Sequence, residues 1–389
     1  MECWQCVLGV PQMISLTWEQ VQAWRLEQQC LVPRLGRRNF IRAVECVLGV
    51  QAQVMSAAEL SIVARVDGLK RADVQRALWQ DRTLVKTWAM RGTIHLFAAE
   101  DLPLVVAARC ADAGRYRLHN FLQFGFTEAQ YDEFLQAVPE VLGDEPMTRE
   151  ALANGVAERM KTPEVSRALL ESSWGTLWKP SMFRGELCFG PSEGRTNTFV
   201  NPRKWLRAWK EWEPTEAQQE VTRRYLRTYG PATPRDFSFW WDGGGTAFGK
   251  KMFESLGDEV ETVDVEGWKA TVLRSTLESM EKVKAEHSVR LLPMFDVYVL
   301  TQSRNLEPVL AKEHRGKVFR PAAWVSAVVL ADGRIEGVWE YETRKGQTLV
   351  KVRMFATPAE KVRRGIETEA KRLEGFLDTK AAVEFVEVA

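Results

Sequence analysis

Residues 71–97 read RADVQRALWQDRTLVKTWAMRGTIHLF. Apolar side chains recur at helical spacing over residues 71–79, which predicts a helix. Residues 83–90 and 93–97 then alternate between apolar and polar side chains on either side of Arg91-Gly92, a pattern typical of two paired strands. This stretch therefore predicts a helix that is followed by a β-hairpin.

The same order of elements recurs twice further along the chain. Helical patterns precede two short strands each time, at residues 148–160, 163–171, 174–179 and 186–200, and at residues 215–228, 234–241, 248–256, 260–265 and 268–273. Two further helices, at residues 17–31 and 38–49, precede the first hairpin. Three helices followed by a two-stranded wing define the winged helix, which binds DNA in many proteins and mediates protein contacts in others. We therefore predict three tandem winged-helix units.

The C-terminal quarter has a different pattern. Short apolar strands follow residue 289, and Gly333 and Gly346 lie in hairpin turns that need a positive φ. This predicts a small antiparallel β-sheet or barrel covered by a last helix at residues 358–376. The expected fold class is α+β, with an extension at 1–14, winged-helix units at 15–130, 131–212 and 213–288, and the β-region at 289–389.

Composition limits the classes of protein to consider. The 389 residues are 45% hydrophobic and 27% charged, which is ordinary for a globular chain of several packed units. The chain has no apolar run long enough to cross a membrane and no secretory leader pattern, so we expect a cytoplasmic protein. The net charge of +1 argues against coating DNA by bulk electrostatics, and any DNA-binding surface must be local.

Cysteine and loop motifs give little support to metal or nucleotide chemistry. Cys3 and Cys6 form one CxxC pair, which a zinc site would need to complete with a second pair or two histidines, and neither is present. The other four cysteines are isolated and are expected to be structural. No phosphate-binding loop, nucleophile elbow or HExxH pair occurs. We predict no metal and no cofactor.

Gln51-Ala52-Gln53 places two carboxamides two positions apart, and in an extended segment both point to one side. By itself this pattern is most often a pair of surface or capping amides. Several other stretches change its interpretation because, with it, they resemble the AlkZ-like DNA glycosylases, winged-helix proteins of the YcaQ type. They are residues 88–102 (WAMRGTIHLFAAEDL), 229–237 (YGPATPRDF), 291–296 (LLPMFD) and 333–339 (GRIEGVW).

The resemblance spans roughly residues 15–380 and implies a monofunctional glycosylase that removes N7-alkylated purines from double-stranded DNA. Some members of that family also unhook interstrand crosslinks. It assigns catalysis to Gln51 and Gln53, two neutral amides that can position a water beside a base that is already cationic. Some relatives carry a carboxylate at the second position, where Gln53 stands here. Because a crosslinked base cannot swing out freely, a C-shaped molecule with an open central DNA-binding cleft is expected.

Other polar residues are candidates for contacts with DNA, namely Arg91, His95, Lys179, Arg184, His314 and Arg320. For Arg91 the alternative is a turn residue, and for His95 it is a partly buried hairpin residue. Asp296 is a candidate for stabilising positive charge on the sugar, although structural pairing with an arginine is the favoured alternative.

Two other classes of function compete with the glycosylase. A non-enzymatic winged-helix transcriptional regulator would need recognition helices in a symmetric dimer, and the chain has no dimerisation signature, so a monomer is expected. An interaction scaffold would leave Gln51 and Gln53 on an ordinary surface with no positive cleft nearby.

Overall fold

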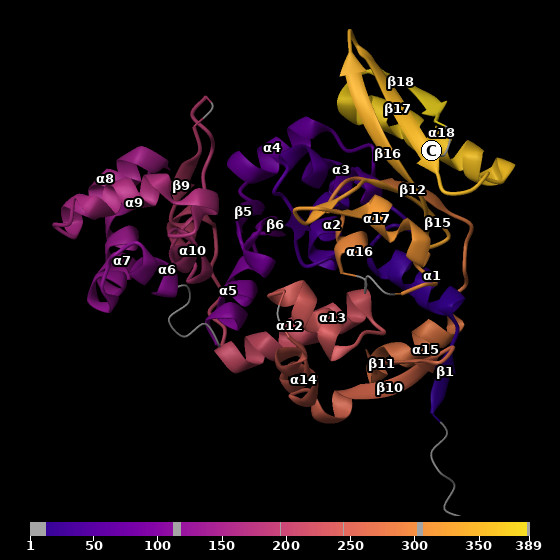
Figure 1. The fold of residues 1–389 in the computed structure, drawn as a ribbon, viewed down its shortest axis with the longest axis horizontal. Coiled ribbons are helices and arrows are strands. Elements are labelled where there is room, and N and C mark those ends of the chain that lie inside the picture. Colours follow the sequence, from indigo (N-terminus) through magenta and orange to yellow (C-terminus); the bar gives the residue numbers. More distant parts are fainter. Residues whose placement is uncertain (1–12, 112–117, 195, 244, 302–305, 387–389) are drawn as a thin grey trace, which may run out of the picture.

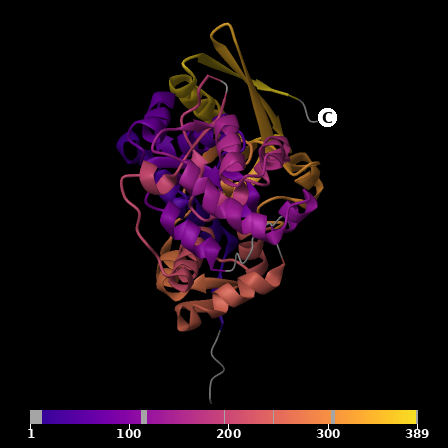
Figure 2. The same ribbon diagram turned by 90° about the vertical axis from the view of Figure 1, so that its left-hand side faces the viewer.

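The computed structural model describes residues 13–111, 118–194, 196–243, 245–301 and 306–386. They form a mixed α+β fold in which several small sheets lie between helices (Figure 1). The Cys3–Cys6 pair lies outside the described residues. In Figure 1 the helices of residues 118–183 occupy one end of the long axis, and Figure 2 views the molecule from that end.

The N-terminal part begins with a short strand and a capped helix. The Thr17 hydroxyl accepts a hydrogen bond from the Gln20 amide at the start of α1, while the Gln20 side chain accepts from the Thr17 amide, which satisfies two free donors. The elements of this part are β1 (Ile14–Leu16), α1 (Trp18–Gln28), β2 (Leu35–Gly36), α2 (Phe40–Cys46), β3 (Val50–Gln51), α3 (Met55–Arg65), β4 (Val66–Asp67), α4 (Arg71–Trp79), β5 (Leu84–Trp88), β6 (Ile94–Ala98) and α5 (Leu102–Cys110).

The predicted helix and hairpin of residues 71–97 are confirmed as α4, β5 and β6. Helix α3, in contrast, was not predicted. All of its residues from Ala57 to Arg65 are buried, so it shows little of the one-sided apolar pattern by which a sequence reveals a surface helix. This missed helix directly follows the Gln51-Ala52-Gln53 motif.

The middle part contains α6 (Leu118–Gln123), α7 (Glu128–Val141), β7 (Met147–Thr148), α8 (Arg149–Arg159), α9 (Glu164–Glu171), α10 (Lys179–Phe183), β8 (Cys188–Phe189), β9 (Thr198–Val200) and α11 (Pro202–Trp205). The prediction of a helix at 174–179 is wrong. Gly175 has φ +63°, which no right-handed helix accommodates, and α10 begins only at Lys179, with Pro180 in its first turn. Strands β7, β8 and β9 join the hairpin of the first part in one sheet of order β3-β6-β5-β8-β9-β7.

The third part follows the predicted order of helices and strands. It consists of α12 (Pro214–Tyr229), α13 (Pro234–Trp241), α14 (Thr246–Glu254), the antiparallel pair β10 (Val260–Val265) and β11 (Trp268–Leu273), and α15 (Arg274–Lys282). Strand β1 pairs in parallel with β10, and Ile14 lies opposite Val263. A strand near the start of the chain therefore completes a sheet whose other two strands belong to the third part.

The C-terminal part is an open sheet and not a barrel. Its elements are β12 (Val289–Leu292), α16 (Val297–Leu300), α17 (Arg315–Val318), β13 (Phe319–Arg320), β14 (Trp324–Val325), β15 (Val328–Ala331), β16 (Arg334–Arg344), β17 (Gln347–Met354), α18 (Glu360–Leu377) and β18 (Lys380–Phe385). The sheet order is β12-β15-β16-β17-β18, and β18 is parallel to β17. Strands β13 and β14 form a separate ribbon. The predicted last helix is confirmed as α18, which lies along the sheet (Figure 1).

The hydrophobic cores combine segments that are distant in the sequence. One core brings together side chains from residues 43–108, 217–256 and 289–376, and a second joins residues 16–31 with residues 263–280 and 292–335. A third lies mainly within residues 121–199. The first and last quarters of the chain are therefore packed into shared cores.

Two cysteines that the sequence treats as isolated are neighbours in space. The Cys30 and Cys46 sulfurs lie 2.9 Å apart, between the ends of α1 and α2, and this contact lowers the pKa of Cys46 to about 7. The four remaining cysteines were expected to be structural because each is isolated in the sequence, and the contact between these two was not predicted.

Candidate active site

The two glutamines lie at the edge of the six-stranded sheet. Gln51 ends β3 and stands directly opposite His95 of β6, and the amide of Ala52 donates to the carbonyl of Ile94 at 2.6 Å. Gln53 follows immediately, before the first turn of α3. The β5–β6 hairpin, which the sequence predicted, therefore provides the strand with which the motif pairs.

The segment before the motif has little freedom. Gly49 has φ +100°, and a Cβ atom built there would lie 2.5 Å from Cε1 of Phe97, so only glycine allows this close approach. Two side chains at the end of α12 hold the same segment, because the Tyr229 hydroxyl donates to the Val47 carbonyl at 2.6 Å and the Thr228 hydroxyl donates to the Cys46 carbonyl at 2.7 Å. The third part of the chain thus fixes the approach to Gln51.

The orientation of both carboxamides follows from their partners. Arg91 donates from Nη2 to Oε1 of Gln51 at 2.9 Å, and the amide of Ile94 donates to Oε1 of Gln53 at 3.3 Å. Because both partners can only donate, each oxygen must face its partner. Among the described residues, no acceptor meets the Nε2 group of either glutamine. Each carboxamide therefore presents N–H donors and one remaining oxygen lone pair.

Arg91 is a positioning residue at the tip of the β5–β6 hairpin. Its φ of +55° turns the side chain toward α13, where Nη1 donates to the Trp240 carbonyl at 2.6 Å. Arg109 binds the next carbonyl, that of Trp241, at 3.2 Å, so two cations meet the negative end of α13. Burial lowers the pKa of Arg91 to about 10, which leaves its guanidinium charged at neutral pH.

His95 lies behind the glutamines and is only 1% exposed. Its Nδ1 lies 3.0 Å from the Thr93 carbonyl, and burial, together with the charge of Arg91, lowers the pKa of the imidazole to about 3. A neutral, buried ring is not placed to bind a phosphate, so this geometry fits the alternative of a buried hairpin residue.

The other residues predicted to contact DNA are dispersed. Lys179 is buried in α10, Arg184 pairs with Glu186 at 2.8 Å, and His314 stacks on Phe355 at 4.1 Å between ring centroids. In the part of the chain that the structure describes, none of these three forms a hydrogen bond or ion pair with Gln51 or Gln53. Arg320 is exposed and lines a cavity described below.

Asp296 occupies a structural position. Its carboxylate is fully buried, and it accepts from Arg65 at 2.7 and 2.9 Å and from the Ser61 hydroxyl at 2.5 Å. It also caps α16 by accepting from the Tyr298 amide at 2.9 Å. This geometry fits the alternative of a structural pair with an arginine, and it leaves no face of Asp296 for a sugar.

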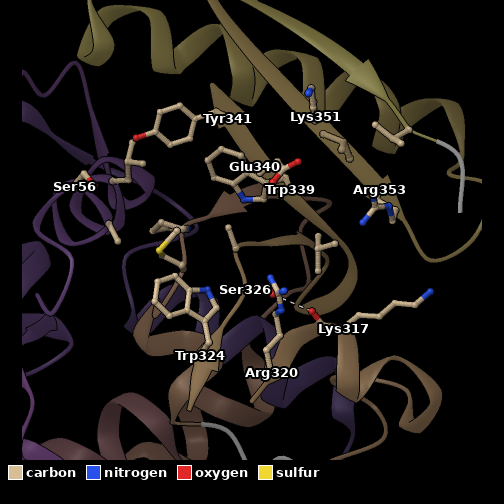
Figure 3. A pocket seen from close by; sticks show the side chains of 18 residues that line it. Ser56, Lys317, Arg320, Trp324, Ser326, Trp339, Glu340, Tyr341, Lys351 and Arg353 are labelled. Carbon is tan, nitrogen blue, oxygen red and sulfur yellow. Dashed lines mark hydrogen bonds between the residues drawn. The ribbon is translucent and has the colours of Figure 1, made fainter. Parts of the chain in front are cut away.

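A cavity of about 620 Å³ lies next to the start of α3 (Figure 3). Its walls come from the first turns of α3, the β13–β14 ribbon and strands β16 and β17. Most of its polar lining was not predicted from the sequence, although the alternation Lys351-Val352-Arg353 indicates that both cations lie on one face of a strand. The missed residues are Lys317, Trp324, Tyr341, Lys351 and Arg353.

The described residues include no group of three or more His, Cys, Asp or Glu side chains placed to hold a metal ion. No helix within the described ranges is both long enough and apolar enough to cross a bilayer.

Comparison with known proteins shows the class of this protein. The family model for AlkZ-like DNA glycosylases matches residues 44–376, which is most of the chain and includes the glutamine pair. The chain belongs to the AlkZ-like DNA glycosylase family. It is therefore an enzyme, a DNA glycosylase, and the competing interpretation as a transcriptional regulator is not supported.

Two comparisons place it among particular relatives. An interstrand DNA cross-link repair glycosylase of Streptomyces sahachiroi is 39% identical over 334 residues, which cover 84% of this chain and 88% of the relative. The solved structure of the Streptomyces sahachiroi DNA glycosylase AlkZ superposes with a TM-score of 0.85 at 35% identity and covers 96% of this chain and 100% of that one.

Proposed function

We propose that this glycosylase hydrolyses the N-glycosidic bond of N7-alkylated purines in double-stranded DNA and unhooks interstrand crosslinks joined through such a base. The observation that carries the proposal is the pair of neutral carboxamides, Gln51 and Gln53, each held by its oxygen at the end of β3. Similarity to an interstrand cross-link repair glycosylase supports the choice of substrate.

The substrate explains why neutral residues suffice. A purine alkylated at N7 carries a positive charge, so the electron pair of the breaking C1′–N9 bond neutralises the departing base and no general acid is needed. Water adds its hydroxyl to C1′ and releases its other proton to solvent. The protein must therefore position the water beside C1′ of the sugar, and hydrogen-bonding groups that are fixed in place can do this.

The contacts of the two glutamines suggest different roles. The Gln51 oxygen is held by a charged guanidinium, so Gln51 offers its Nε2 hydrogens to a sugar or phosphate oxygen of the DNA. Gln53 is less buried, and its oxygen has only a long bond of 3.3 Å to a backbone amide. The Gln53 oxygen is therefore the group that accepts a hydrogen bond from the attacking water.

The arrangement of the DNA-binding surface is part of the same proposal. Residues 15–130, 131–212 and 213–288 act as three winged-helix units, followed by the β-region at 289–389, and together they curve around a central cleft for a monomer on duplex DNA. The order of three helices and a hairpin in residues 214–273 supports this division. An open cleft suits a crosslinked base that cannot be fully extruded.

The test is excision from a duplex that contains a single N7-methylguanine, with abasic sites revealed by alkali. Gln51→Ala and Gln53→Ala should each lower the rate constant under single-turnover conditions by about 100-fold, the effect of losing one placed hydrogen-bonding group. Arg91→Lys keeps the charge but cannot bridge Gln51 and Trp240 with a planar fork, so a smaller loss is expected.

Matched variants separate these effects from general damage to the fold. Gln347→Ala and Arg76→Lys change exposed residues for which the structure shows no hydrogen bond or ion pair with Gln51 or Gln53, and they should leave the rate unchanged. If Gln51→Ala and Gln53→Ala excise the base as fast as wild type while duplex binding stays intact, neither glutamine takes part in the mechanism. The same assay on a duplex crosslinked through guanine N7 tests the unhooking step.

A further inference from the structure

The cavity beside α3 has a positive rim that the fold does not use. Four cations line it, Lys317, Arg320, Lys351 and Arg353, against a single carboxylate, Glu340. None of the four forms an ion pair with a carboxylate of the described residues. Nearby arginines of the same part of the chain are paired, as in Arg334 with Glu336, Arg344 with Glu342 and Arg364 with Glu360. On a chain of net charge +1, this is a local concentration of unpaired positive charge.

Aromatic side chains form two walls of the same cavity. Trp324 is 41% exposed, with its edge fixed against Phe295 at 5.0 Å between ring centroids. Tyr341 lies on the opposite side and stacks on the buried Trp339 at 5.9 Å (Figure 3). The exposed indole is held in place by its packing on Phe295, which leaves one face of a rigid aromatic ring open to the cavity.

The cavity adjoins the catalytic motif. Ser56 and Ala57 line its wall, and they stand three and four residues after Gln53 in the first turn of α3. In Figure 3 Ser56 faces the cavity from the side opposite Lys351 and Arg353. A group held in the cavity would therefore be only a short distance along the DNA from the base that is being removed.

We infer that this cavity binds one unpaired, undamaged nucleotide of the DNA substrate, next to the damaged nucleotide, with its base between Trp324 and Tyr341 and its phosphate on the cationic rim. A flat ring on an aromatic wall and a phosphate on arginine and lysine are how proteins hold single-stranded nucleotides. The volume of about 620 Å³ is in the range of small-molecule sites. The inference rests on the proposed function and adds a second DNA subsite to it.

The charge of the cavity excludes the most obvious other occupant. An N7-alkylated purine is itself cationic, and four cations against the single carboxylate of Glu340 would repel it. A neutral base with an anionic phosphate is favoured by the same field. By holding the undamaged nucleotide next to the lesion in an unpaired state, the subsite would give the glutamines access to a base that cannot leave the helix by itself.

Binding of an unmodified hexathymidylate, followed by fluorescence anisotropy of the full chain, tests the subsite without catalysis. Trp324→Ala should weaken binding about ten-fold, the effect of losing one stacked base, and Arg320→Ala should lower the slope of log affinity against log salt by about 0.7. Arg344→Ala, an exposed arginine outside the cavity, should change neither quantity. Equal affinity of wild type and Trp324→Ala for hexathymidylate would overturn the inference.

A second measurement links the subsite to the reaction. With wild-type protein, a mismatch beside the N7-methylguanine should lower KM several-fold and leave kcat unchanged, because the neighbouring nucleotide is already unpaired. Trp324→Ala should lose this advantage, and retention of the full advantage would overturn the inference. Gln51→Ala should lose excision but keep hexathymidylate binding, so a failure of the proposed chemistry and a failure of the subsite give different results.

Discussion

At the scale of single residues, buried polar side chains stabilise the segment that carries Gln51 and Gln53. Arg91 and His95 lie close together in one hairpin, yet Arg91 is charged and holds Gln51, whereas His95 is neutral. The difference comes from the ordinary pKa values of the two groups. Burial lowers both, but the pKa of the guanidinium falls only from 12.5 to about 10, whereas that of the imidazole falls from 6.5 to about 3.

His95 predicts a dependence of stability on pH. The pKa of His95 is about 3 in the folded protein and about 6.5 in the unfolded chain. Between these two values the imidazole is protonated in the unfolded chain but stays neutral in the folded protein. The contribution of His95 to stability is complete above pH 6.5 and is lost as the pH falls toward 3. At pH 5 the loss is about 2 kcal/mol.

Urea unfolding at pH 7.5 and pH 5 measures this loss. The fall in the free energy of unfolding should be about 2 kcal/mol smaller for His95→Gln than for wild type. His119→Gln, at an exposed position on α6, should behave like wild type. The same fall in all three proteins would mean that His95 titrates normally in the folded state.

At the scale of elements, the site depends on the short strand β3 and on the turn that leads into it. Two residues pair with β6, and the preceding turn is held by the end of α12, so the motif has few contacts of its own. Gly49 is the position at which this arrangement is least tolerant of change, because both its φ and its contact with Phe97 require glycine.

Gly49→Ala should lower the free energy of unfolding by about 2 kcal/mol and reduce excision more than stability alone explains, since relieving the contact with Phe97 displaces Gln51. Gly257→Ala is a matched control, because Gly257 also has a positive φ but has no atom within 4 Å of an added Cβ. Chemical unfolding and single-turnover excision on both variants give the comparison. Similar losses of activity in the two variants would contradict a special role for the β3 turn.

At the scale of the whole molecule, distant parts of the chain are joined by buried polar contacts as well as by shared cores. The pair Arg65–Asp296 links α3 to the C-terminal part with both side chains fully buried. Arg25 of α1 donates to the carbonyls of Tyr229 and Pro231, which links the N-terminal and third parts. We therefore expect these parts to unfold together.

Asp296→Asn should lower the free energy of unfolding by about 3–5 kcal/mol, because the Arg65 charge stays buried without its counter-charge. Asp81→Asn breaks a surface pair with Arg76 and should cost at most about 1 kcal/mol. Urea unfolding followed by tryptophan fluorescence should show one transition, shifted strongly only for Asp296→Asn. A shift like that of Asp81→Asn would mean that solvent reaches the pair.

The local sequence was sufficient for the elements whose pattern is local. The hairpin of residues 84–98, the helices α8, α9, α12, α13 and α18, and the strand pair β10–β11 were all predicted, because amphipathic spacing and turn residues act over a few positions. The two glutamines were singled out from the sequence only through resemblance to a family, since carboxamides alone are common, and their catalytic role stays a prediction.

Tertiary structure alone decided what surrounds those residues. The sequence shows neither that Arg91 holds Gln51, nor that Asp296 lies buried on Arg65, nor that Trp324 and four cations line one cavity beside α3. Helix α3 was missed because it is buried on every side, and β1 because its partner, β10, lies far from it in the sequence. A local pattern records which side chains avoid water, whereas long-range packing selects their partners, and that selection depends on the whole chain at once.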